Sequence, residues 1–415
     1  MDKIVLVHGK YFNSWEALGL GYISSYLKKH VPNVEFLFFQ GSFDDIQDIL
    51  KSCIDAQFLL LSCMSPSFQY GVNLAREAKK INPKIKTVFG GYHTSALPHE
   101  SLVEGVDYVV VGEGESAVLD ILNGKPDHII YARRMSFDEL PWPDRDVIKN
   151  YRNIKVAFKD NKKNITSFQS HRGCPFHCKY CADGHEKILF RGDGCRSVSR
   201  SVDDLLDEMQ FVTQKYNLHL LKFCDSTWNL RKGFVKEFCQ KKLQRDFNMP
   251  FYPNIHANVV DDEMFRLMGD ANCYEIGLGV ESGSPTILNQ IGKGTTLDSI
   301  RNAVSLAKRY KIKVRGYFIL GMPNESEDDV YMTEKFADEL DLDEYGFTIL
   351  CPYPGTQMYS ATNEFKNIDW SNTDEYSNDF WKTKYLDNAT LKSWQSRLTQ
   401  KFKKKITWHN TQIKE

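Results

Sequence analysis

Three cysteines, Cys174, Cys178 and Cys181, stand within one short segment near the middle of the chain. Thiolate sulfur selects zinc or iron–sulfur clusters among the metals that proteins bind. Three thiolates can hold three irons of a four-iron cluster, which leaves the fourth iron open for another ligand. A fully ligated electron-transfer cluster needs a fourth cysteine. The spacing C-x3-C-x2-C therefore favours an iron–sulfur cluster that acts on a bound molecule.

Two other sites can be built from the same thiols. A zinc knuckle could add His171 or His177, and a distant thiol such as Cys195 or Cys224 could complete a cluster. Zinc ligands usually come as two separated couples, whereas this triplet is compact. The zinc-stabilised binding module stays open as a non-catalytic alternative.

Length and charge limit the class of protein. The chain has 415 residues, with 53 Lys and Arg against 54 Asp and Glu, a net charge of -1. This length predicts two or more hydrophobic cores, and the balanced charge makes a nucleic-acid partner unexpected. We find no apolar run near the roughly 20 residues that cross a bilayer, and the first residues lack the order of a signal peptide. We expect a cytoplasmic protein without a membrane partner, whose ten cysteines serve metal or redox chemistry before disulfides.

The first third of the chain alternates short apolar runs with helix-like stretches. Near-continuous β-branched and aromatic runs are typical of parallel strands that are covered on both faces. The runs are residues 3–9, 34–40, 58–63, 86–90 and 107–112. They predict a flavodoxin- or Rossmann-like doubly wound parallel sheet over residues 1–136, whose ligands bind at the carboxyl ends of the strands.

Small and polar residues gather at those carboxyl ends. Glycine lets a ligand approach the backbone, and hydroxyl groups can hydrogen-bond phosphate or amide groups. Each segment alone is typical of a tight turn, but several in one domain predict a ligand cleft. The candidate cleft residues are Ser62, Gly90, Gly91, His93, Thr94, Gly112 and Glu113.

A proline-containing linker, residues 137–160, separates the sheet domain from a second series of strands. The predicted strands are 165–169, 218–224, 251–257, 274–280, 314–321 and 345–350. Six strand–helix repeats predict a partial (β/α)6 TIM-like barrel over residues 161–360, with the cysteine triplet directly after its first strand. Residues 361–415 carry Leu391, Trp394, Leu398, Phe402 and Ile406 at helical spacing, which predicts a short helical C-terminal tail packed on the barrel.

The cysteine motif resembles that of the radical S-adenosylmethionine (SAM) superfamily. Cys174, Cys178 and Cys181, with Tyr180 as the aromatic residue before the last cysteine, match its C-x3-C-x-aromatic-C pattern. The resemblance implies a 4Fe-4S cluster whose open iron chelates the amino and carboxylate groups of SAM. Reduction then cleaves SAM and releases a 5'-deoxyadenosyl radical. It also implies an external electron donor such as flavodoxin or ferredoxin.

Three later strand ends extend the resemblance. The segment 277–284 is similar to the fourth-strand motif and would supply Glu281 and Ser282 to SAM. The segment 314–323 is similar to the fifth-strand motif and would supply Arg315 and Leu320. The second strand ends in Asp225 and Ser226, where many members carry a Gly-Gly-Glu-like segment that touches the SAM ammonium group.

The sheet domain ahead of the barrel resembles the cobalamin-binding branch of the superfamily. There the corrin lies on the strand ends, facing the barrel, and its nucleotide tail enters the sheet domain. Many cobalamin domains carry Asp-x-His-x-x-Gly after the first strand, whereas this chain has His8 without that aspartate. The lower cobalt ligand therefore stays open.

The resemblance implies methyl transfer to an unactivated carbon of a small metabolite or peptide. One SAM would methylate cobalt, and a second would supply the radical. The alternatives are radical cyclisation, rearrangement or oxidation, with cobalamin absent or not a methyl carrier, and a non-catalytic protein that binds SAM and a cluster, or zinc. Candidate substrate contacts are Trp228, Asn254, His256 and Tyr353.

Overall fold

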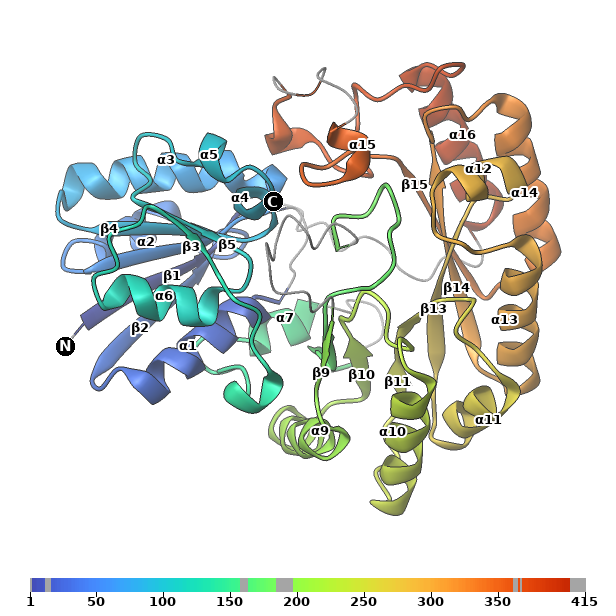
Figure 1. Cartoon of the computed structure of the whole chain (residues 1–415), viewed down its shortest axis with the longest axis horizontal. Coiled ribbons are helices and arrows are strands. Elements are labelled where there is room, and N and C mark those ends of the chain that lie inside the picture. The colour runs from blue at the N-terminus through green and yellow to red at the C-terminus, as the bar shows by residue number, and fades with distance from the viewer. Residues whose placement is uncertain are drawn as a thin grey trace.

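A computed structural model of the chain shows two α/β units side by side, the sheet domain at the left and the barrel at the right (Figure 1). The structure describes residues 2–11, 16–156, 163–183, 197–360, 365 and 368–403. Within these residues, no helix is both long enough and apolar enough to cross a bilayer.

The sheet domain has six parallel strands in the order β2-β1-β3-β4-β5-β6. The strands are β1 (Asp2–His8), β2 (Val34–Gln40), β3 (Phe58–Ser62), β4 (Lys86–Gly90), β5 (Tyr108–Val111) and β6 (Ile129–Tyr131). The helices are α1 (Leu18–His30), α2 (Ile46–Ser52), α3 (Ser65–Ile81), α4 (Tyr92–Ala96), α5 (Pro98–Ser101) and α6 (Gly114–Leu122). The predicted doubly wound sheet is confirmed, and the short strand β6 was missed.

Both faces of this sheet are buried, which explains its unbroken apolar runs. On β1, Val5 and Val7 belong to one core, while Ile4 and Leu6 belong to the core on the opposite face. Side chains alternate between the faces of a strand, so a strand covered on both sides needs apolar residues at every position.

The barrel is partial and parallel, as predicted. Its strands pair in the orders β7-β10-β11 and β12-β13-β14-β15. They are β7 (Ile165–Phe168), β10 (Leu220–Phe223), β11 (Phe251–Tyr252), β12 (Asn254–Ile255), β13 (Glu275–Glu281), β14 (Lys313–Leu320) and β15 (Glu344–Ile349). The predicted strand 251–257 is interrupted at Pro253, which has no N–H to donate to a neighbouring strand.

Helices cover the outside of the barrel (Figure 1). They are α9 (Val202–Tyr216), α10 (Lys232–Gln244), α11 (Asp262–Asp270), α12 (Pro285–Gln290), α13 (Leu297–Arg309) and α14 (Glu327–Leu340). After β7, the two-residue strands β8 (His171–Arg172) and β9 (Val198–Ser199) pair as an antiparallel ribbon. The chain between β8 and β9 includes the three candidate cluster cysteines.

The segment between the two units is a linker that buried polar contacts hold in place. It contains the short helices η1 (Phe137–Glu139) and α7 (Tyr151–Val156). Arg145 is buried and donates hydrogen bonds to Glu208 of α9 at 2.9 Å and to the carbonyl of Ser167 in β7 at 2.8 Å. A buried guanidinium requires such partners, so this contact fixes the linker against the barrel.

The C-terminal segment packs on the edge strand β15 of the barrel and also contacts the sheet domain. It contains α15 (Gln357–Ser360), η4 (Trp370–Asn372) and α16 (Asn388–Lys401), and α16 packs on β15, which confirms the predicted helical tail. Ile406 lies outside the described residues. The indole of Trp381 donates to the carbonyl of Gly321 at 2.6 Å, which ties the tail to the turn after β14, and η4 packs on α3 of the sheet domain.

Glu325 caps the turn after β14. Its carboxylate accepts the backbone N–H groups of Gly321 and Met322, and its own carbonyl accepts the hydroxyl of Thr383 in the tail at 2.9 Å. Burial raises the pKa of Glu325 to about 8, and the two backbone donors lower it only in part. The folded protein therefore favours the neutral carboxyl.

We predict that Glu325→Gln weakens the pH dependence of stability. Because the folded pKa of about 8 lies above the ordinary value of 4.5, the wild type loses stability as pH rises through this interval, by up to about 1.4 kcal/mol per pH unit. The amide cannot ionise, so the variant should gain in thermal midpoint over the wild type between pH 5 and pH 8. A difference in midpoint that stays constant with pH would contradict the assignment.

Candidate active site

The cysteine loop begins where β8 ends. Cys174 and Cys178 are buried and Cys181 is half-buried. The backbone N–H of Lys179 donates to the carbonyl of Ile291 at 2.9 Å, which pins the loop against the end of α12. The ring of Phe176 stacks on His256, with centroids 3.9 Å apart and planes inclined by 8°. The loop is thus held at the carboxyl end of the barrel strands, where such folds place their active sites.

The donor set suits an iron–sulfur cluster. Burial raises the pKa of the Cys178 thiol to about 11, although the Lys293 ammonium group opposes this rise. A thiol that binds metal is deprotonated, so bound iron would compensate the charge that burial disfavours. The described residues contain no group of three His, Cys, Asp or Glu side chains already gathered around one metal position.

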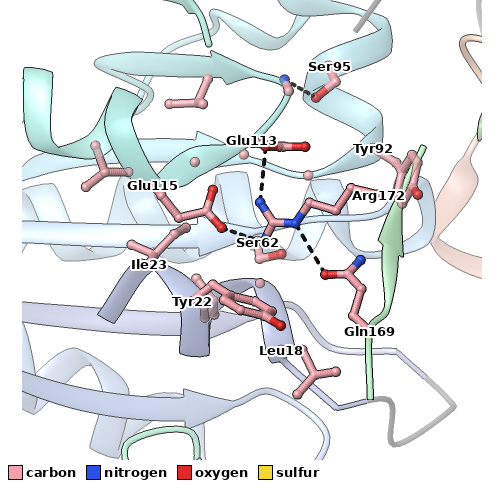
Figure 2. A pocket seen from close by; sticks show the side chains of 18 of the residues that line it. Leu18, Tyr22, Ile23, Ser62, Tyr92, Ser95, Glu113, Glu115, Gln169 and Arg172 are labelled. Atoms are coloured by element: carbon pink, nitrogen blue, oxygen red, sulfur yellow. Dashed lines mark hydrogen bonds and ion pairs between the residues drawn. The ribbon is translucent and has the colours of Figure 1, made fainter. Parts of the chain in front are cut away.

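A cleft of about 320 Å³, here called the domain cleft, separates the sheet domain from the cysteine loop (Figure 2). Its polar rim comes from the carboxyl ends of β3, β4 and β5, and barrel residues from Gln169 to Gly173 close it from the other side. Its apolar floor extends between α1, α6 and the sheet. The floor residues are Leu18, Ile23, Leu60, Val88, Val110 and Val118.

Glycines shape the rim of the domain cleft. A Cβ at Gly91, whose φ is +105°, would lie 2.5 Å from the carbonyl oxygen of Cys63. A Cβ at Gly114 would lie 2.6 Å from the Cδ1 atom of Ile23. At Gly90, by contrast, the nearest atom to an added Cβ is the Cβ atom of Val110 at 4.0 Å, an ordinary van der Waals distance that leaves room for a side chain. The rim therefore allows a large ligand to lie against the backbone.

Arg172 joins the cysteine loop to the sheet domain across this cleft. Its guanidinium is buried and forms ion pairs with Glu115 at 2.7 Å and Glu113 at 3.1 Å, and it lies over the ring of Tyr22 at 4.8 Å (Figure 2). Arg134 adds a second ion pair to Glu113 at 3.3 Å. Burial raises the pKa of Glu113, and the Arg172 charge acts against that rise.

A second hollow, here called the barrel cavity, measures about 760 Å³ and is lined mainly by β14, β15 and the C-terminal segment. At the end nearest the cysteine loop, Tyr180 donates to Glu281 at 2.8 Å, and Lys293 forms an ion pair with Glu281 at 2.5 Å. Glu281 has a φ of +66°, and the register between β13 and β14 shifts between Gly279 and Glu281. This bulge re-aims the carboxylate into the cavity at a cost in backbone strain.

Arg315 lies in the same cavity but already has acidic partners. Its guanidinium pairs with Glu275 at 3.1 Å and with Glu344. The predicted contact between Arg315 and the SAM carboxylate therefore competes with two buried carboxylates in this structure.

The structure distributes the predicted site residues over three places. Ser62, Gly90, Gly91, Gly112, Glu113, Asp225 and Ser226 line the domain cleft. Tyr180, Glu281 and Arg315 line the barrel cavity. His93, Thr94, Ser282 and Leu320 line neither.

Those last four residues have packing roles. His93 stacks on Phe68 and contacts the hydroxyl of Ser65 at 3.0 Å. Thr94 donates to the carbonyl of Gly91 at 3.0 Å. The other two belong to the barrel wall, where the Ser282 hydroxyl contacts that of Thr333 at 3.1 Å and Leu320 is fully buried.

Asp225 is a predicted site residue whose carboxylate has one oxygen atom available to a ligand. Its Oδ1 atom accepts the backbone N–H groups of Ser170 and His171, while its buried Oδ2 atom has no hydrogen-bond partner in the described part of the chain. The carboxylate is therefore rigidly held, with one oxygen left for a ligand. His8 does not line either cavity.

Sequence reasoning missed several residues of the domain cleft, above all Arg172, Glu115, Tyr92 and Asp183. Tyr92 donates to Asp183 across the cleft at 2.5 Å. One signal was available for Arg172 and Glu115, since charged residues beside apolar strand ends must find partners when they are buried. Which residues would pair could not be read from the spacing.

Comparison with known families matches both units. Residues 168–337 match the radical SAM superfamily, and residues 4–122 match the B12 binding domain. The chain contains a radical SAM domain and a B12-binding domain. Its cofactors are accordingly a 4Fe-4S cluster, SAM and cobalamin.

Individual relatives cover most of this radical SAM protein. An uncharacterized methyltransferase of Pyrococcus horikoshii is 28% identical over 85% of this chain and 80% of its own length. The anaerobic magnesium-protoporphyrin IX monomethyl ester cyclase of Rubrivivax gelatinosus is 21% identical over 87% of this chain and 70% of its own length.

Two solved structures share the whole architecture. The radical SAM methyltransferase TsrM from Kitasatospora setae, determined with tryptophan and a SAM analogue, superposes with a TM-score of 0.69 at 17% identity, over 86% of this chain and 75% of TsrM. The cobalamin-dependent radical enzyme OxsB, with aqua-cobalamin and SAM bound, gives a TM-score of 0.67 at 18% identity. The latter match covers 98% of this chain but only 62% of OxsB. These similarities establish the fold.

The residues present fit these groups. The domain cleft offers glycines at its rim and an apolar floor, which suit a large ring system with an aromatic appendage. The cysteine loop supplies three thiols, and the unpartnered Oδ2 atom of Asp225 is available to an ammonium donor.

We predict that Gly90→Leu blocks cobalamin binding. The new side chain would enter the domain cleft without a backbone clash, because the nearest atom to its Cβ is 4.0 Å away. Titration with hydroxocobalamin should show at least about a tenfold loss of affinity. The ligand must first displace the leucine side chain from the cleft, and burial of such a side chain stabilises the protein by about 1.5–3 kcal/mol.

The matched control is Gly233→Leu on α10, where an added Cβ meets nothing within 4 Å. Iron content after reconstitution should be the same in both variants. Wild-type cobalamin affinity in Gly90→Leu would show that the corrin does not use this cleft.

Proposed function

We propose that this protein is a cobalamin-dependent radical SAM enzyme that transfers a methyl group to an unactivated carbon of a small molecule or peptide. The observation that carries the proposal is the place of the cysteine loop, which lies against the barrel cavity through Tyr180 and is joined through Arg172 to the domain cleft. The P. horikoshii relative named as a methyltransferase supports the same reaction class.

When bound, the cluster with SAM supplies a carbon radical and cobalamin supplies a methyl group for transfer. Cys174, Cys178 and Cys181 would hold the cluster, and Asp225 would offer its unpartnered Oδ2 atom to the SAM ammonium group. Tyr180 orients Glu281 toward the cavity through its 2.8 Å hydrogen bond. These contacts pre-organise the site, which reduces the entropy cost of bringing the groups together.

The walls of the site also protect the reaction. The barrel cavity is walled by β14 and β15 and by Glu375, Tyr376, Gln395 and Thr399 of the C-terminal segment. Exclusion of water and of other side chains matters because a primary radical reacts with any nearby hydrogen donor. An external one-electron donor of the flavodoxin or ferredoxin class would reduce the cluster.

A second candidate function is radical cyclisation without methyl transfer. The observation that favours it is the similarity to the cyclase of R. gelatinosus, which is 21% identical over 87% of this chain. Transfer of deuterium from substrate into 5'-deoxyadenosine, with no methylated product, would select this reaction.

We predict that Cys178→Ala removes the cluster and abolishes SAM cleavage. Loss of one of three thiolates leaves a four-iron cluster with too few protein ligands. Anaerobic reconstitution should give iron and sulfide at background level, and 5'-deoxyadenosine should fall to the level of a protein-free control.

The control is Cys224→Ala, which removes another thiol from the edge of the domain cleft. Its iron content should equal that of the wild type, because the proposal needs no fourth cysteine. Equal iron loss in both variants would identify Cys224 as a ligand and contradict an open iron, while zinc without sulfide in the wild type would indicate a binding module.

A further inference from the structure

The carboxylates around the barrel cavity are paired with cations at some positions and not at others. Glu281 is paired with Lys293, and Glu344 shares Arg315 with Glu275. Glu375, which the C-terminal segment contributes to the same cavity, accepts only from neutral donors in the described part of the chain, the hydroxyl of Tyr353 at 2.5 Å and its own backbone N–H. No Lys, Arg or His within the described ranges forms an ion pair with Glu375.

A second acid makes this end more negative. Asp374 is buried next to Glu375, and its Oδ1 atom accepts the backbone N–H groups of Tyr376 and Ser377, each at 2.6 Å. Those bonds hold Asp374 to the backbone, but their donors are neutral N–H groups that do not balance the negative charge of the carboxylate. Burial raises the pKa of Glu375, and the neighbouring Asp374 adds to that rise. An uncompensated carboxylate in such a place is costly, and a cationic ligand would repay the cost.

Glu375 is held firmly at the cavity wall. Its backbone carbonyl accepts the N–H of Ile349 at the end of β15, at 3.0 Å. Its side chain is fixed by Tyr353, whose ring stacks on Trp370 with centroids 5.9 Å apart. The carboxylate is therefore placed by a strand end and an aromatic pair, and is not a mobile surface group.

Tyrosine side chains line the cavity together with this carboxylate. Tyr317, Tyr353 and Tyr376 line the same cavity as Glu375. The face of a tyrosine ring attracts ammonium groups, and a nearby carboxylate strengthens that attraction. Aromatic rings combined with a carboxylate are a chemistry that recognises amines.

An anionic ligand lacks a matching partner in this cavity. Arg315 already contacts two carboxylates, and Lys293 contacts Glu281 and the carbonyl of Gly279. A phosphate or carboxylate would have to displace one of these pairs and would also meet the repulsion of Glu375. A neutral ligand would leave Glu375 uncompensated.

We infer that the substrate of this enzyme carries an ammonium group, which binds to Glu375 in the part of the barrel cavity that Tyr353 and Tyr376 also line. The inference rests on the proposed function for the identity of the barrel cavity as the substrate site. Tyr180 and Glu281 line the part of the cavity that adjoins the cysteine loop, which the proposed function assigns to SAM. The substrate amine therefore anchors on the C-terminal segment, which supplies Glu375 to the cavity wall.

Three phenyl compounds of similar size test the charge preference. Phenethylamine, 2-phenylethanol and 3-phenylpropionate are titrated into the full-chain protein, reconstituted with cluster and cobalamin and saturated with SAM, and binding is followed by ligand-observed NMR. Phenethylamine should bind in preference to the alcohol and the acid. Glu375→Gln should weaken it by about tenfold or more, the usual loss for a charge-assisted hydrogen bond.

Two controls separate the site from general effects. Glu104→Gln removes the same charge from a carboxylate that is 90% exposed and should leave phenethylamine binding unchanged. Tyr353→Phe keeps the ring but removes the hydrogen bond to Glu375, and should weaken binding less than Glu375→Gln. The thermal midpoint of each variant is compared with that of the wild type. Binding is interpreted only for variants whose midpoint equals the wild-type value. If Glu375→Gln does not fold, Tyr353→Phe provides the test.

Three results would overturn the inference. They are equal or tighter binding of the alcohol or the acid, wild-type amine affinity in Glu375→Gln, and a loss of SAM affinity in Glu375→Gln in place of amine affinity. The last result would assign Glu375 to SAM. The amine titration involves no turnover. Failure of methyl transfer would contradict the proposed function, whereas failure of amine binding would contradict this inference, and the two experiments give separate results.

Discussion

The buried ion pairs of Arg172 are the constraint on which the site depends. This guanidinium stands two residues before Cys174, the first thiol of the loop, and its partners Glu113 and Glu115 stand where β5 leads into α6. Breaking a buried pair by removing one partner typically costs about 3–5 kcal/mol, because it leaves an uncompensated charge. Glu115 also lies in the first turn of α6, where the helix dipole favours an acid. The contact therefore fixes the cysteine loop relative to the ligand-binding edge of the sheet.

The rest of the architecture follows from this juxtaposition. Parallel strands collect their functional residues at their carboxyl ends, and here the carboxyl ends of two separate sheets face one another. The domain cleft lies on one side of the cysteine loop, and the barrel cavity extends on the other. The hydrogen bonds of Arg145 in the linker and the contact between α3 and η4 hold the two units together at separate places. One fold thus brings two ligand sites to the same iron–sulfur motif, which is the arrangement that a two-cofactor reaction needs.

The sequence predicted the elements better than the contacts. Strands with unbroken apolar runs, such as residues 4–7 of β1 and 58–61 of β3, were found because burial on both faces leaves a pattern in the chain. The strand β6 was missed because it is only three residues long. The cysteine loop and the glycines of the cleft rim carry signals that depend on residue type and spacing. The partners of Arg172 and Arg315 do not, because pairing across a cleft depends on how distant segments pack. Glu375 also lies outside every motif, and its importance emerges only from the missing counter-charge.

The central claim is that SAM bound at the cysteine loop and cobalamin bound in the domain cleft react with one another. The most direct measurement is the amount of S-adenosylhomocysteine formed anaerobically, with a reductant and SAM but without substrate, by the full-chain protein reconstituted with both cofactors. The account predicts an amount equal to the bound corrin, and none from protein that holds the cluster alone. The same S-adenosylhomocysteine yield with and without cobalamin, or no yield in either case, would contradict it.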